Sequence, residues 1–240
     1  FSTVDVTTVS GNADVRVAHG KVVARDIGGS ADIETSYSPL ECRNVGKGAT
    51  LRNAHGSVTA DTIGGITEIT TKFGETDIRS INGDLTVINE HGAVKADDVD
   101  GNVKANTSFA SIKISRTTGD ISAINQHGSI TVSNLLSGES AKPRSITLKS
   151  SFNTITLSAP SNLSATFKGV TSFGDLQVDY PLTLRAGGLS MSNASTKNIE
   201  GVIGDGRDTI VIENGNGSIK LINDGSTMTS APRSAEPKRK

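Results

Sequence analysis

The sequence predicts an all-β fold: a single-stranded parallel β-helix, or β-solenoid, built from 18-residue coils. Three observations predict it. Aliphatic residues and glycines recur every 18 residues from the start of the chain to about residue 135. Within each period the aliphatic residues form alternating pairs, the pattern of short strands with one inward face. Each histidine, His19, His55, His91 and His127, is followed by glycine, and each lies 36 residues from the next.

The composition favours a thin, layered structure over a wide globule. Aromatic residues make up 3% of the 240 residues, tryptophan is absent and there are 26 glycines. The net charge of -1 creates no overall field that would attract nucleic acid or an anionic membrane surface. Cys42 follows the inward pattern, so we expect it to be a small buried hydrophobic residue.

The repeat defines columns of equivalent residues, numbered from the first residue of each coil. Coils begin at residues 1, 19, 37, 55, 73, 91, 109 and 127. Position 4 is occupied by Val4, Val22, Leu40, Val58, Thr76, Val94, Ile112 and Ile130. Position 6 is occupied by Val6, Ala24, Cys42, Ala60, Ile78, Ala96, Ile114 and Val132. Positions 9, 13 and 15 are also mostly aliphatic, so each coil is predicted to hold two or three short strands.

Glycine at position 11 favours a bend between these strands. It occurs in six of the first seven coils, at Gly11, Gly29, Gly65, Gly83, Gly101 and Gly119. One coil cannot bury its own face, but stacked coils can, each strand pairing in parallel with its equivalent one coil away. Eight coils at the usual interstrand spacing would form a rod about 35 Å long. The spacing does not match the hexapeptide period of left-handed β-helices and favours a right-handed coil.

We expect one solenoid domain over residues 1–223, with a loop inserted near residues 137–144. The pattern resumes at Ile146 and Leu148, and Phe152 takes position 1. A further aromatic corner follows at Phe173, and residues 204–223 indicate two strands around a turn. Residues 224–240 lack both apolar register and turn chemistry, and they are predicted to form a disordered basic tail.

The histidines belong to a column that alternates with aromatic residues. After Phe1, position 1 is occupied by His19, Tyr37, His55, Phe73, His91, Phe109 and His127. Position 17 alternates in step between threonine and asparagine, which can pass hydrogen bonds along the stack. Successive histidines would lie about 9.6 Å apart, too far to share one zinc ion. We therefore interpret the column as a structural stack that caps one edge of the core, and we expect no metal or other cofactor.

One acidic cluster is the best candidate for chemistry. Asp97, Asp98 and Asp100 lie close together, with Lys95 nearby and Asp61 two coils away. Enzymes built on parallel β-helices typically cleave polysaccharides with clustered carboxylates and a basic residue. The alternatives are a weak calcium or sugar site, or a solvated ladder of opposite charges. We expect the ladder and no enzymatic activity.

The chain resembles a bacterial domain-of-unknown-function family of adhesin-like β-solenoids. The resemblance rests on GDLTVINEHGAVKADDVDGNVKA, TGDISAINQHGSITV and the late GDGRDTIVIENGNGSIKLI, and it covers most of residues 1–223. It implies a non-enzymatic domain that is exported or associated with the cell envelope, and it brings no catalytic residues.

These observations lead to a functional hypothesis with two alternatives. We expect an extracytoplasmic structural, adhesive or interaction surface for protein or glycan, in the periplasm, on the cell surface or secreted. Any membrane contact would run through a segment outside this chain, such as a signal peptide or anchor before Phe1, and no nucleic acid partner is expected. The alternatives are a polysaccharide lyase or hydrolase, and a scaffold that assembles by stacking of the solenoid ends.

Overall fold

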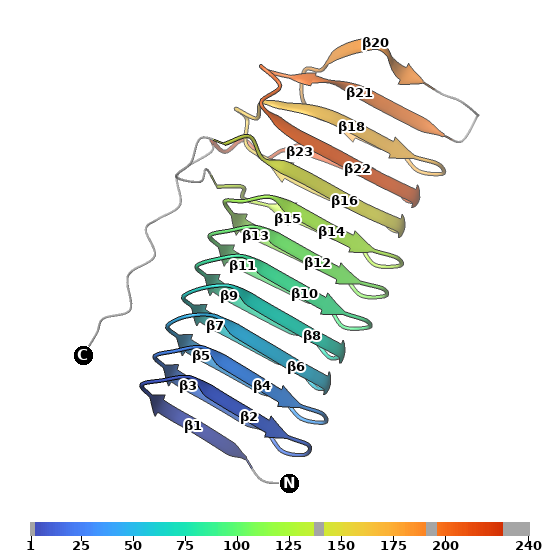
Figure 1. Ribbon diagram of the computed structural model, residues 1–240. Helices are drawn as coiled ribbons and strands as arrows, with labels where there is room; N and C mark the ends of the chain where they lie inside the picture. The colour runs from blue at the N-terminus through green and yellow to red at the C-terminus, as the bar shows by residue number, and fades with distance from the viewer. Residues whose placement is uncertain (1–2, 137–141, 191–195, 228–240) are drawn as a thin grey trace.

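The computed structural model is a β-solenoid with two strands in each coil. It describes residues 3–136, 142–190 and 196–227, with side chains omitted for residues 185–190. The strands stack along one axis from β1 at one end to β20 and β21 at the other (Figure 1). The predicted insertion lies partly, and the predicted tail mostly, outside these ranges.

Two sheets face each other across the core. The first sheet has the order β1 (Val4–Val9), β3 (Val22–Ile27), β5 (Leu40–Val45), β7 (Val58–Ile63), β9 (Thr76–Ile81), β11 (Val94–Val99), β13 (Ile112–Thr117), β15 (Ile130–Ser133), β17 (Ile155–Ala159), β23 (Ile219–Asn223) and β19 (Leu176–Val178). The second sheet has the order β2 (Ala13–Val17), β4 (Ala31–Thr35), β6 (Ala49–His55), β8 (Thr67–Phe73), β10 (Leu85–Asn89), β12 (Val103–Thr107), β14 (Ile121–Asn125), β16 (Ser145–Phe152), β22 (Asp208–Asn216), β18 (Ala165–Thr171), β21 (Lys197–Ile203) and β20 (Thr183–Ser190).

The predicted parallel β-solenoid with 18-residue coils is confirmed by the strand pairing. Val4 pairs with Val22, and Val22 pairs with Leu40, so each strand lies beside its equivalent in the next coil. The inward columns form one continuous core in which most side chains are almost fully buried. Cys42 is fully buried, and this burial raises the pKa of its thiol to about 12.

A residue with a left-handed backbone at position 8 of the first eight coils explains why positions 6 and 9 both face inward. In a regular strand, residues three apart point to opposite sides. Position 8 has a left-handed backbone with φ of 50–63° at Thr8, Asp26, Asn44, Thr62, Ser80, Asp98, Arg116 and Asn134. The pairing skips this residue, since Thr7 pairs with Arg25 and Val9 with Ile27. The left-handed conformation bends the chain, so that position 9 also faces the core. Sequence reasoning did not identify this column.

The coils near the C-terminus are not stacked in chain order. Strands β22 and β23 lie between the coil of β16 and β17 and the coil of β18 and β19, and all these contacts are parallel. The two strands predicted within residues 204–223 therefore exist, but they lie in different sheets. Strands β21 and β20 then add antiparallel to the second sheet. In Figure 1 the orange β22 is accordingly seen between β16 and β18.

The insertion before β16 leaves the register intact. Ile121 pairs with Ile146, and these residues are 25 apart instead of 18, so seven additional residues lie between the two coils. Ile146 and Leu148 fill the core positions that the sequence assigns to them, both almost fully buried.

The left-handed column predicts opposite effects for one substitution at two threonines. Asparagine tolerates a left-handed backbone better than a β-branched residue does, so Thr62→Asn should stabilise the fold by about 0.5–1 kcal/mol. Thr59→Asn, in the regular part of β7, should be neutral or destabilising because asparagine is a poor strand former. Urea unfolding measures both, and a destabilised Thr62→Asn variant would contradict the left-handed conformation at position 8.

Candidate functional sites: the corner ladder, the acidic patch and a buried ion pair

The position-1 rings form one continuous ladder at a corner of the coil. Neighbouring ring centroids are 4.6–5.1 Å apart with interplanar angles of 4–14°. The members are His19, Tyr37, His55, Phe73, His91, Phe109, His127 and Phe152. Parallel stacking of aromatic rings contributes about 0.5–1.5 kcal/mol per pair beyond the buried area.

The ladder lies at the edge of the core, and its rings are partly exposed. Tyr37 is 57% exposed, Phe109 54% and Phe73 42%, so the ring edges face solvent while the faces cover each other. Tyr37 separates His19 from His55, with centroid distances of 4.9 and 5.0 Å. Among the described residues, no three histidine, cysteine, aspartate or glutamate side chains gather into a metal site.

Buried asparagines behind the rings tie successive corners together. The Asn89 amide donates to the Gly74 carbonyl of the preceding coil at 2.9 Å, and its oxygen accepts from Gly92 N at 2.8 Å. Asn125 bonds in the same way with Ala110 and Gly128. A Cβ on Gly92 would collide with the Gly74 carbonyl group. The Asn-x-His-Gly motif therefore forms a corner. Its asparagine is required for the amide hydrogen bonds, and its glycine is required because a Cβ would not fit.

The acidic patch lies on the outer face of the first sheet and at its edge. Asp97 accepts hydrogen bonds from Ser115 and Arg116 of the next coil, both at 2.6 Å. Asp100 accepts from Thr118 at 2.8 Å, and Asp98 is one of the left-handed residues.

Lys95 and Asp61, the other two residues of the patch, do not converge on a common centre with the three aspartates. Lys95 is exposed on β11. Asp61 is separated from Asp97 by Arg79, which pairs with both in the strand register. The patch residues thus bond along the stack rather than converge on a shared point, which is the geometry of a charge ladder.

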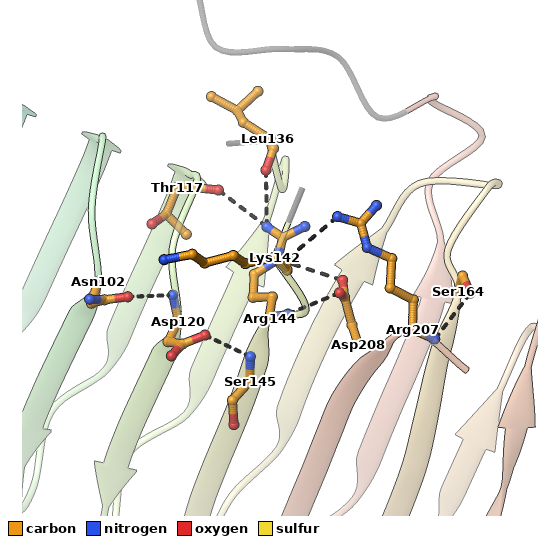
Figure 2. A network of polar contacts seen from close by, with 10 residues as sticks. All are labelled: Asn102, Thr117, Asp120, Leu136, Lys142, Arg144, Ser145, Ser164, Arg207 and Asp208. Carbon is orange, nitrogen blue, oxygen red and sulfur yellow. Dashed lines mark hydrogen bonds and ion pairs between the residues drawn. The ribbon is translucent and has the colours of Figure 1, made fainter. Parts of the chain in front are cut away.

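A buried ion pair lies next to the insertion that precedes β16, and the sequence did not predict it. Arg144 and Asp208 have side chains only 7% and 10% exposed, and Arg144 Nε lies 3.7 Å from Asp208 Oδ2. Arg144 Nη1 donates to the carbonyls of Leu136 at 3.0 Å and Thr117 at 3.5 Å. Figure 2 shows Arg144 near the ends of neighbouring strands, with its contacts to these groups drawn as dashed lines.

The electrostatics of this pair are dominated by burial. Desolvation lowers the pKa of Arg144, and the nearby Asp208 carboxylate opposes that shift. Asp208 also accepts from the Arg144 backbone N–H at 3.0 Å, and it begins the inserted strand β22. The pair therefore connects the residue preceding β16 to the coil inserted beside it.

A second column of hydrogen bonds continues across the insertion. Asp120 N donates to the Asn102 side chain at 2.9 Å, and Ser145 N donates to the Asp120 side chain at 2.7 Å (Figure 2). On the far side, Arg207 N donates to Ser164 Oγ at 3.3 Å. The network is a structural joint, since its polar groups are directed at backbone and at each other.

Comparisons of the chain with family models, with curated proteins and with solved structures found no match. None of the described residues forms a helix long and apolar enough to cross a membrane.

The ladder predicts that the stability of the protein depends on a flat ring at position 1 and does not depend on bound metal. His91→Ala removes two stacking contacts and should destabilise the protein by about 1–2 kcal/mol. His91→Phe keeps a flat ring and should change stability by less than about 0.5 kcal/mol. Thermal unfolding with and without zinc checks both statements, and a zinc-dependent rise in Tm that disappears in His91→Phe would contradict them.

The buried pair predicts strong coupling between its two residues. Arg144→Met leaves Asp208 charged and buried without its partner, and should cost about 3–5 kcal/mol. Arg144→Met with Asp208→Leu should cost much less than the sum of the single changes, as a double-mutant cycle in urea would show. Lys149→Met is the matched control, because its ion pair with Glu213 is half exposed and should contribute less than about 1 kcal/mol. Additive single effects would refute the coupling.

Proposed function

We propose that this chain is a non-enzymatic, extracytoplasmic β-solenoid that presents a structural and adhesive surface to protein or glycan. The observation that carries the proposal is the regularity of the outer faces. Each outward position recurs at every coil, so outward side chains form rows along the stack. Rows of this kind suit an extended partner that contacts many coils weakly. The extracytoplasmic location rests on the family resemblance of the strand motifs.

The outer face of the second sheet is the better candidate for binding. Two shallow grooves lie on it, one along β10, β12, β14 and β16 and one along β14, β16, β22 and β18. Hydroxyl and amide side chains such as Thr86, Asn106 and Thr147 alternate there with the exposed aliphatic residues Ile88 and Ile124. Surfaces that mix hydrogen-bonding groups with small apolar patches are typical of non-obligate interfaces.

Ion pairs occupy parts of both faces, including Arg52 with Asp32 and Lys149 with Glu213 on the second sheet. On the first sheet Glu41 is engaged by Lys21 at 2.5 Å and Arg25 at 3.4 Å, and Asp77 is engaged by Arg79 at 2.8 Å. These ion pairs engage the charged groups within the protein. The hydrogen bond from Lys21 lowers the pKa of Glu41. A partner would have to replace those contacts, whereas Thr86 and Thr147 line an open groove.

The test compares the two faces with one substitution. The pair Thr86→Glu and Thr147→Glu changes the second sheet, and the pair Thr59→Glu and Thr131→Glu changes half-buried outward threonines of the first sheet. Retention on a panel of immobilised acidic and neutral polysaccharides and surface proteins should fall about tenfold for the first pair only, because new carboxylates occupy the groove. Circular dichroism should show both variants folded.

Three outcomes would overturn the proposal. Retention of the unaltered chain by no member of the panel would remove the binding surface, and equal loss in both pairs would remove the choice of face. Release of new reducing ends from an acidic glycan, abolished by Asp97→Asn with Asp98→Asn, would establish the enzyme instead.

A further inference from the structure

The reordered coils leave one rung of the corner ladder without a ring. Phe152 pairs in register with Asn216, not with another aromatic residue. Phe173 occupies the same corner one coil further, since its N–H donates to Gly215 O at 3.2 Å just as His127 N donates to Ser108 O. The position-1 column therefore continues as Phe152, Asn216 and Phe173, with an asparagine where the pattern has a ring.

The spacing of this open rung matches one flat ring. Phe152 and Phe173 are two coil steps apart, about 9.6 Å at the usual interstrand spacing. The intact ladder has centroid spacings of 4.6–5.1 Å, so two successive spacings fill that separation. A single aromatic ring inserted there would face both phenyl rings at the distance that every other rung adopts.

The side chain of Asn216, which occupies the rung, is held by a weak hydrogen bond. The Asn216 amide donates to Ser151 O at 3.3 Å, which is long for a hydrogen bond, and its side chain is exposed. Phe173 is 70% exposed, compared with 54% for Phe109, which has a ring on each face, and 43% for Phe152, so the more open wall of the rung is Phe173. An incoming ring would have to turn the Asn216 amide aside and would then cover apolar surface that water now contacts.

A groove beside the rung can receive the remainder of a partner. Gln126, Ser151, Ser172 and Gly215 line its end near the corner. Further along, Lys149 and Glu213 form an ion pair at 2.8 Å across it. Peptide and side-chain groups of this kind offer donors and acceptors to an extended polypeptide.

We propose that the rung at Asn216, between Phe152 and Phe173, binds an aromatic side chain of a partner protein. Every other rung takes a ring of amino-acid size at the same spacing, which is the reason for choosing this occupant. The inference deepens the proposed function by naming one partner chemistry. Its test uses no polysaccharide, so its failure can be distinguished from failure of the binding face.

The probe is N-acetyl-tryptophanamide, titrated against the protein with the aromatic NMR signals of Phe152 and Phe173 observed. Shifts confined to those two rings should saturate with a Kd on the order of millimolar, as expected for a single small ring. Asn216→Phe fills the rung and should weaken binding by at least about tenfold. It should also add ring contacts and raise Tm. Phe173→Leu removes one stacking face, and it should weaken binding even if Asn216→Phe fails to fold.

The matched control creates the same site elsewhere. Phe109→Asn opens a rung between His91 and His127, and it should add a second set of shifts at those rings while leaving the first unchanged. Three results would overturn the proposal: no saturable shifts at concentrations on the order of tens of millimolar, equal binding by Asn216→Phe, or tighter binding of adenosine or methyl glucoside than of the tryptophan amide.

Discussion

The parallel backbone ladder between coils is the constraint on which the rest of the structure depends. Gly28 N donates to Val9 O, Gly46 N to Ile27 O and Gly64 N to Val45 O, so equivalent residues of successive coils are fixed about one strand spacing apart. Each residue then packs against its own equivalents. A core column must be filled by side chains that fit above and below themselves, which accounts for small aliphatic residues. A corner column must leave room for the carbonyl of the coil beside it, which accounts for Gly92 over Gly74.

Polar columns reinforce the same register from the corners. Asn89 bonds to two coils at once, and Asn102 and Asp120 continue a chain of side-chain to backbone bonds. Because these side chains satisfy backbone groups that the bends leave without ladder partners, they favour one alignment of the coils over a slipped one. The alternation of asparagine with threonine, and of histidine with aromatic residues, shows that the unit of the corner is two coils, although the unit of the core is one.

The repeating part of the fold could be predicted from the sequence because each column is sampled eight times. The seven ring residues of the corner follow from the same sampling. What escaped prediction lacks that signal. Position 8 holds threonine, aspartate, asparagine, serine and arginine, which look like ordinary exposed residues, so its left-handed backbone left no recognisable pattern. An inward pattern shows that β22 and β23 face a core, but not which coils they lie between. Arg144 follows an insertion outside the register, where its burial could not be inferred.

The reordered last coils show which columns of equivalent residues continue through the stack and which column does not. The buried polar column continues through it as Ser150, Asn214 and Thr171, and the aliphatic column as Ile155, Ile219 and Leu176. The ring column is interrupted at Asn216. Since the coils stack there without a ring, stacking of the backbone does not depend on the ladder. Arg144 and Asp208 stand at the same joint, and a buried pair of this kind fits a role in specifying which coil inserts. The exposed rings are therefore the part of the repeat that is free to contact something else.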